Sequence, residues 1–293
     1  MGESGAAWLR DLPDLLDRLA SEWQLEIGAT LDGGSAGYVG FVTLHTGESA
    51  VLKLPICGQD PARAASRVLL AASGEGYVNV LRHDATSDAM LMERLGPRLE
   101  SLGLTIEDQI RHICRTLQIA WRAPVQPGEF PNGADKARDL AEFIRKLWRD
   151  LDEPCSLGVI ETALEFAERR GAAYDPADAV LAHADAHASN TLLVPGSQPM
   201  SFKLVDPEGL FIERAYDLAI PMRDWGAELL AGDPLSLGKR RCRLLAELTG
   251  VDAQPIWEWG FIERVSTGLL LKSFGFDGEA AEYLSVAEAW TPA

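Results

Sequence analysis

The sequence predicts an α+β protein of two lobes, with a β-rich N-terminal lobe over residues 1–95 and a mostly helical C-terminal lobe over residues 96–293. Three observations lead to this prediction. Residues 38–54 hold two runs of β-branched and aromatic side chains around a polar turn, which is typical of a hairpin. From Thr105 onward most apolar residues recur at helical spacing. Between these regions an apolar strand runs into Gly96-Pro97, a pair that favours a boundary.

The N-terminal lobe begins with a helix expected over residues 8–23, where leucines recur every three or four positions. A glycine-rich stretch at residues 32–37 precedes the hairpin, and a second helix is expected over residues 62–72. Two further strands are expected near residues 77–81 and 89–93. This lobe therefore reads as helix, hairpin, helix and two strands.

The C-terminal lobe begins with a helix whose start has a capping signal, because Asp108 stands three residues after Thr105. The other expected elements are an amphipathic helix over residues 135–150, a helix over 156–170 closed by Gly171, a strand-and-loop region over 179–206, and helices from Ala215 to the end.

The composition excludes several classes of protein. A hydrophobic fraction of 47% and a charged fraction of 24% fit an ordered globular chain. A net charge of −17 argues against a nucleic-acid partner, since phosphate contacts need Lys and Arg. The four cysteines form no CxxC pair, which argues against a zinc site or a disulfide scaffold. No segment has the apolar length of a membrane span or the pattern of a signal peptide, so we expect a cytoplasmic protein with no membrane partner.

The most informative stretch is residues 181–193. Phosphoryl transfer needs a carboxylate facing the acceptor hydroxyl, oxygen ligands for Mg²⁺, a cation on the phosphates and a loop of exposed backbone N–H groups. Asp185 and Asn190 are five residues apart, as in a protein-kinase catalytic loop, and Asp206 follows sixteen residues later. Lys53 in an apolar strand, after the glycine-rich stretch, completes the set in the expected order. Each element alone is common, but together they indicate a phosphotransferase.

These residues carry a family resemblance. The run His183-Ala-Asp185-Ala-His187-Ala-Ser-Asn190 resembles the HxDxHxxN loop of the aminoglycoside phosphotransferases. Residues 205–208 resemble the metal-binding Asp segment of that family, and residues 215–219 resemble the segment of a later structural Asp. The chain looks most similar to the branch of streptomycin 6-phosphotransferases and hydroxyurea phosphotransferases.

The resemblance implies a two-lobed, protein-kinase-like fold that uses ATP and Mg²⁺. The roles it implies are a catalytic base at Asp185, metal ligands at Asn190 and Asp206, a phosphate-binding Lys53, adenine contacts along the backbone from Glu93 to Leu95, and a phosphate cover at Ser35 and its neighbours. His183 is expected to brace the loop.

Two departures from the family pattern stand out. Position 184 is Ala where many members have Gly. A kinase normally pairs its lysine with a helix glutamate, and the helix after Pro61 has none; Asp60 and Glu75 are the nearest acids. The partner of Lys53 is therefore left open.

An aminoglycoside is a polycation, so its site should be lined by carboxylates. The candidates for acceptor binding are His187, Glu208, Asp224, Trp225, Glu228 and Glu258. The function that fits best is an O-phosphotransferase acting on streptomycin as a resistance enzyme. The alternatives are a kinase for another hydroxyl metabolite or hydroxyurea, and a catalytically silent, nucleotide-binding pseudokinase. The density of acidic residues around the acceptor site would distinguish a streptomycin phosphotransferase from a kinase for a small neutral acceptor.

Overall fold

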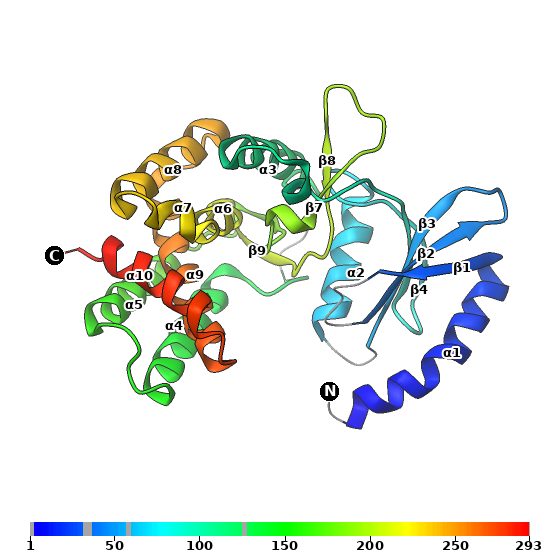
Figure 1. Ribbon diagram of the computed structural model, residues 1–293, viewed down its shortest axis with the longest axis horizontal. Helices are drawn as coiled ribbons and strands as arrows, with labels where there is room; N and C mark the ends of the chain where they lie inside the picture. Colours follow the sequence, from blue (N-terminus) through cyan, green and yellow to red (C-terminus); the bar gives the residue numbers. More distant parts are fainter. Residues whose placement is uncertain (1–2, 32–36, 57–59, 125–127, 293) are drawn as a thin grey trace.

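The computed structural model describes residues 3–31, 37–56, 60–124 and 128–292 (Figure 1). The sheet lies at one end of the long axis and most of the helices lie at the other. The elements are α1 (Glu3–Trp23), β1 (Leu25–Thr30), β2 (Gly37–Leu44), β3 (Ser49–Pro55), α2 (Asp60–Ala72), β4 (Val80–Asp84), β5 (Ala89–Glu93), η1 (Leu99–Leu102), α3 (Ile106–Ala120), α4 (Gly133–Asp150), α5 (Leu157–Ala172), β6 (Ala179–Ala182), η2 (Ala188–Asn190), β7 (Thr191–Leu193), β8 (Phe202–Leu204), β9 (Leu210–Glu213), α6 (Ala215–Arg223), α7 (Gly226–Leu230), α8 (Pro234–Thr249), α9 (Ala253–Ser273) and α10 (Asp277–Trp290).

The five-stranded sheet has the order β1-β2-β3-β5-β4, and each neighbouring pair is antiparallel. Side chains alternate between the two faces of β3. Leu52 and Leu54 are fully buried in the cluster that contains Leu19 of α1. Val51 and Lys53 point to the opposite face, where they line a cleft. The period of the strand therefore places a lysine in the cleft.

Two strands differ from the expectation. Strand β1 was not predicted, and the strand expected near residues 77–81 begins at Val80. The reason is that Val78 donates its backbone N–H to Leu204 O at 2.9 Å, while Leu204 N–H bonds Gly76 O at 2.9 Å. Residues 76–78 therefore pair with β8 of the helical lobe instead of extending β4.

Helix α9 forms the centre of the helical lobe, with Trp259, Ile262 and Val265 fully buried. Its buried side chains join those of α5, α6, α8 and α10 in one core. At 21 residues, α9 and α1 are the longest helices in the described part of the chain. Among the described residues no helix combines the length and apolarity that crossing a bilayer requires.

Helix α5 ends later than expected. It continues through Gly171 to Ala172, so this glycine does not close the helix. A Cβ on Gly171 would lie 3.4 Å from the Cβ of Ala137 on α4. The glycine thus serves the close packing of α4 on α5 rather than a C-cap.

The lobe boundary expected at residue 95 stays a prediction. Strand β5 ends at Glu93, and the chain then crosses toward the helical lobe. Gly96 N–H bonds Leu193 O at 2.7 Å, and Leu193 N–H bonds Pro97 O at 3.0 Å. The crossing segment is thereby held against β7.

Candidate active site

The loop after β6 is braced by His183, which is fully buried. Its Nδ1 accepts the backbone N–H of Asp185 at 3.1 Å, and its Nε2 donates to Val205 O at 2.8 Å. Its ring stacks on Tyr77 with centroids 5.9 Å apart. Burial lowers the pKa of His183, which favours the neutral ring that this bonding pattern requires. The side chain holds the loop against the segment after β8, as expected.

Asp217 of α6 holds the start of the same loop. Its carboxylate accepts the backbone N–H groups of His183 at 3.1 Å and Ala184 at 2.7 Å, and Trp121 Nε1 at 2.7 Å. Ala184 has a φ of +70°, a left-handed conformation that usually favours glycine. Two hydrogen bonds at this turn therefore offset the backbone strain of Ala184.

We expect Asp217→Ala to lower the free energy of unfolding by about 3 kcal/mol or more. The substitution leaves three buried N–H donors without an acceptor, and each one left unpaired costs about 1–3 kcal/mol. Urea unfolding followed by circular dichroism measures the change. Asp178→Ala, in an exposed turn, is the control. A loss below about 1 kcal/mol would show that water replaces the carboxylate.

Asp185 lies beyond this turn, and each of its carboxylate oxygens has a partner. Oδ2 is 3.3 Å from His187 Nε2, and Oδ1 accepts from Arg223 Nη2 at 3.0 Å. His187 Nδ1 accepts the N–H of Asn190, so the proton on Nε2 faces Asp185. Burial alone would raise the pKa of Asp185, but the bond from His187 and the charge of Arg223 hold it well below its usual range. Asp185 is therefore an ionised carboxylate at neutral pH.

A cleft of about 270 Å³ lies between the sheet and the loop that carries Asn190. The apolar side chains of Val39 and Val51 line it from the sheet, and Leu192 lines it from β7. Its other lining residues include five of the predicted site residues, namely Lys53, Glu93, Leu95, Asn190 and Asp206. Residues that are far apart in the sequence thus meet at a single cavity.

The polar end of this cleft carries the residues predicted to bind a metal. Asn190 Nδ2 donates to the backbone oxygen of Asp185 at 3.0 Å, so its amide oxygen is the atom that it can offer to a cation. Asp206 has a φ of +57° and a half-exposed side chain. Its carboxylate pairs with Lys53.

The apolar end of the cleft contains the segment predicted to contact adenine. Glu93 N–H already donates to Asn79 O at 3.0 Å, and the Glu93 carboxylate binds Lys203. In the described part of the chain the Leu95 N–H has no hydrogen-bond partner. Leu95 N–H is therefore a backbone donor that this segment can offer to a ligand.

The structure supplies a partner for Lys53 that the sequence left open. The ion pair with Asp206 takes the place of the usual helix glutamate. Glu75 is exposed in the turn after α2, and no ion pair within the described ranges links it to Lys53. Ser35, the predicted phosphate cover, lies outside the described residues, as does the side chain of Asp60.

Three of the predicted acceptor-binding residues lie close to Asp185. They are His187, Glu208 and Asp224. The nearest cation to the Glu208 carboxylate is Lys136, at 3.9 Å. Desolvation and the nearby carboxylates of Asp185 and Glu263 raise the pKa of Glu208. This side of the loop therefore has a surplus of acids.

The other predicted acceptor residues have structural partners. Glu228 pairs with Arg241, whose guanidinium lies 5.6 Å from the ring of Trp225. Glu258 is 1% exposed and pairs with Arg169 and Arg170 of α5. The structure thus does not bring Glu258 to the site, because its charge is needed to pair with those arginines.

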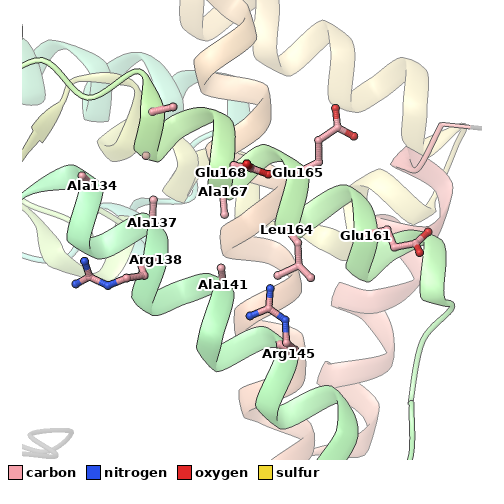
Figure 2. Close-up of a pocket in the computed structure, with 12 residues that line it drawn as sticks. Ala134, Ala137, Arg138, Ala141, Arg145, Glu161, Leu164, Glu165, Ala167 and Glu168 are labelled. Atoms are coloured by element: carbon pink, nitrogen blue, oxygen red, sulfur yellow. The ribbon is translucent and has the colours of Figure 1, made fainter.

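A second hollow lies on the outside of the helical lobe, between α4 and α5 (Figure 2). Small side chains at the crossing, such as Ala137 and Ala167, leave a groove of about 580 Å³. The arginines Arg138 and Arg145 come from α4, and glutamates come from α5. None of the predicted site residues lines this groove, so the smaller cleft is the candidate site.

The chain matches known proteins over most of its length. Residues 22–272 match the family described as aminoglycoside/hydroxyurea antibiotic resistance kinase. The chain belongs to this family. The streptomycin 6-kinase of Streptomyces griseus is 28% identical over 291 residues, which cover 98% of this chain and 92% of that protein. The streptomycin 6-kinase of Streptomyces glaucescens is 28% identical over 263 residues, 89% of this chain and 83% of that protein.

A solved structure of spectinomycin phosphotransferase, in complex with ADP and spectinomycin, superposes with a TM-score of 0.61. It covers 95% of this chain and 93% of that chain at 13% identity, so the likeness concerns the fold. The predicted two-lobed kinase-like fold is thereby confirmed. This member of the aminoglycoside/hydroxyurea kinase family is a phosphotransferase that acts on hydroxyl groups.

Sequence reasoning missed one residue of this family member's site. Arg223 contacts the Asp185 carboxylate, and its position in the sequence of α6 could have identified it. It is the only charged residue after Asp217 in α6, a helix that is otherwise buried from Ala215 to Met222. An arginine at the end of a buried helix must find carboxylate partners, and this is the pattern that would have identified it.

Proposed function

We propose that this protein transfers the γ-phosphoryl group of ATP, with Mg²⁺, to a hydroxyl of a cationic aminoglycoside, and that streptomycin is the first acceptor to test. The observation that carries the proposal is the convergence of Lys53, Asn190 and Asp206 on one cleft, with Asp185 on the adjoining loop. The same set of residues is what phosphoryl transfer requires. The similarity to two streptomycin 6-kinases supports the choice of acceptor.

The proposed reaction assigns a task to each side chain. Asp185 accepts a hydrogen bond from the acceptor hydroxyl and orients its oxygen toward the γ-phosphorus. A new O–P bond forms as the bond to the bridging oxygen of ADP breaks, and the hydroxyl proton passes to the Asp185 carboxylate.

The donor set of the cleft fits Mg²⁺. This ion takes one or two protein oxygens and completes its shell with water and substrate phosphates. The carboxylate of Asp206 and the amide oxygen of Asn190 are hard oxygen donors at the same cavity. Among the described residues no group of three or more His, Cys, Asp or Glu is placed to hold a metal ion. When bound there, the ion would neutralise charge on the phosphates.

The charge around Asp185 favours a cationic acceptor over a neutral one. The carboxylates near it are Glu208, Asp224 and Glu263, and the nearby cations are Arg223 and Lys136. A small neutral acceptor such as hydroxyurea would gain little from this surplus of acids, whereas ammonium and guanidinium groups form charge-assisted hydrogen bonds with it.

A pseudokinase remains the alternative of a different class. The observation that supports it is the lack of a glutamate in the helix after Pro61, because that glutamate normally holds the lysine of a kinase in place. The contact between Lys53 and Asp206 argues against it, because the lysine is held at the cleft by another carboxylate. A protein without turnover would also leave the bonds that position Asp185 unexplained.

The test is ADP release by the purified protein with ATP and Mg²⁺. Streptomycin, kanamycin, hydroxyurea and a blank without acceptor are compared. We expect turnover with streptomycin well above the blank, and mass spectrometry should show one added phosphate. Turnover confined to hydroxyurea would overturn the cationic acceptor, and nucleotide binding without turnover of any acceptor would favour the pseudokinase.

A further inference from the structure

The last turn of α6 is fixed by two buried arginines from other helices. Arg241 of α8 donates from Nη1 to Pro221 O at 3.2 Å and to Asp224 O at 2.6 Å. Arg264 of α9 donates from Nη2 to Met222 O at 2.7 Å. Cations suit the end of a helix, where the last carbonyls have no partner within the helix. The backbone on both sides of Arg223 is therefore held in place.

The side chain of Arg223 is held as firmly as its backbone. Nη2 donates to Asp185 Oδ1 at 3.0 Å, Nε donates to Asp224 Oδ1 at 3.1 Å, and Nη1 lies 3.8 Å from Glu263 Oε2. Tyr216 donates its hydroxyl to the other oxygen of Glu263. The side chain of Arg223 is 14% exposed. Its three nitrogens thus face three different carboxylates, and the planar guanidinium has little freedom to turn.

These contacts fix the orientation of the Asp185 carboxylate. Arg223 holds Oδ1 and His187 faces Oδ2, so the plane of the carboxylate is defined from both sides. Each oxygen has a second lone pair that can accept a further hydrogen bond. A hydroxyl that binds at this carboxylate would therefore meet an acceptor whose direction is already set.

We propose that Arg223 is a positioning residue for phosphoryl transfer, which orients the Asp185 carboxylate without itself contacting the acceptor. The proposal rests on the proposed function, because it takes Asp185 as the group that receives the acceptor hydroxyl. The low exposure of Arg223 and its engagement with three carboxylates separate this role from that of an acceptor-binding cation.

Several charged groups bear on the titration of Asp185. They are His183 and His187 in its own loop, Glu208 after β8, Asp224 after α6, Glu263 on α9 and Tyr283 on α10. His187 and Arg223 both lower the pKa of Asp185, and Arg223 is the one of the two whose positive charge does not titrate near neutral pH. Its removal should therefore shift the titration of Asp185 to higher pH.

Arg223→Met removes the charge and the hydrogen bonds at similar length, and Arg223→Lys keeps the charge without the planar fork. We expect kcat for streptomycin to fall about 100-fold in the Met variant, as when a reacting group is misplaced by about 1 Å. The nucleotide Kd should be unchanged, the acceptor KM should change far less than kcat although Arg223 also binds Asp224, and the Lys variant should recover part of kcat. Arg240→Met, at an exposed arginine of α8, is the matched control.

A second measurement does not depend on turnover. Carbon-13 NMR of labelled aspartates follows the Asp185 carboxylate, which the Asp185→Asn spectrum identifies. We expect its titration midpoint to move to higher pH in Arg223→Met and to stay unchanged in Arg240→Met. If no acceptor is turned over by the wild type, the proposed function fails while this titration still tests the role of Arg223.

Three results would overturn the proposal. One is an Arg223→Met variant whose kcat and Asp185 titration both match the wild type. A second is a rise confined to the acceptor KM, which would make Arg223 an acceptor-binding residue. The third is an equal loss of kcat and nucleotide affinity in both Arg223 variants with a lowered melting temperature, which would assign it to folding alone.

Discussion

Replacing Asp185 with Asn should lower kcat by about 1,000-fold, within the range of about 10²–10⁴ that general base catalysis contributes. The amide keeps the size of the side chain but can neither take the acceptor proton nor carry the charge that Arg223 and His187 hold in place. The nucleotide Kd should change little. The Asp185 carboxylate points to Arg223 and His187, whereas the cleft that would hold the nucleotide is lined by other residues, including Asn190 and Asp206. Steady-state ADP release gives kcat, and isothermal titration with ATP and Mg²⁺ gives Kd.

The matched control is Asp178→Asn, which changes an exposed carboxylate in the turn before β6. It should leave both quantities at wild-type values. If Asp185→Asn weakened nucleotide binding as much as turnover, Asp185 would belong to the nucleotide site and not to the acceptor site. A kcat near that of the wild type would mean that another group receives the proton.

Much of this site can be predicted from the local sequence. Alternation along β3 places Lys53 on the face opposite to Leu52 and Leu54, and the structure shows this arrangement. The spacing of Asp185 and Asn190 brings them onto one short loop, where Asn190 Nδ2 bonds the backbone of Asp185. Such relations need only a few residues of chain, so spacing and residue type suffice to predict them.

The remainder depends on contacts between distant segments. The partner of Lys53 comes from a residue 153 positions away, and Arg223 reaches a carboxylate 38 positions away. Glu258 looks like an acceptor residue in the sequence, yet α5 brings two arginines against it. The charge of such side chains predicts that they need partners when buried, but the identity of each partner depends on how the helices pack.

Asp206 is the residue whose loss should most affect nucleotide binding. Its backbone has a φ of +57°, a conformation that Asp and Asn tolerate better than other residues with side chains. Asp206→Asn is therefore a better test than Asp206→Ala, which would add backbone strain to the loss of charge. The amide keeps the shape of the side chain and removes the negative charge that faces Lys53.

We expect Asp206→Asn to weaken nucleotide binding in the presence of Mg²⁺ by about 100-fold, since a carboxylate next to a cation contributes several kcal/mol at an effective dielectric of about 20. Binding without Mg²⁺ should change far less, so the ratio of the two Kd values should fall toward one. Titration of the variant with ATP, with and without Mg²⁺, measures this ratio.

Lys53→Met is the matched comparison, because it breaks the same ion pair from the other side but keeps the carboxylate. It should weaken binding both with and without Mg²⁺. If the Mg²⁺ dependence of Asp206→Asn equalled that of the wild type, the metal would be held elsewhere and Asp206 would serve only to anchor Lys53.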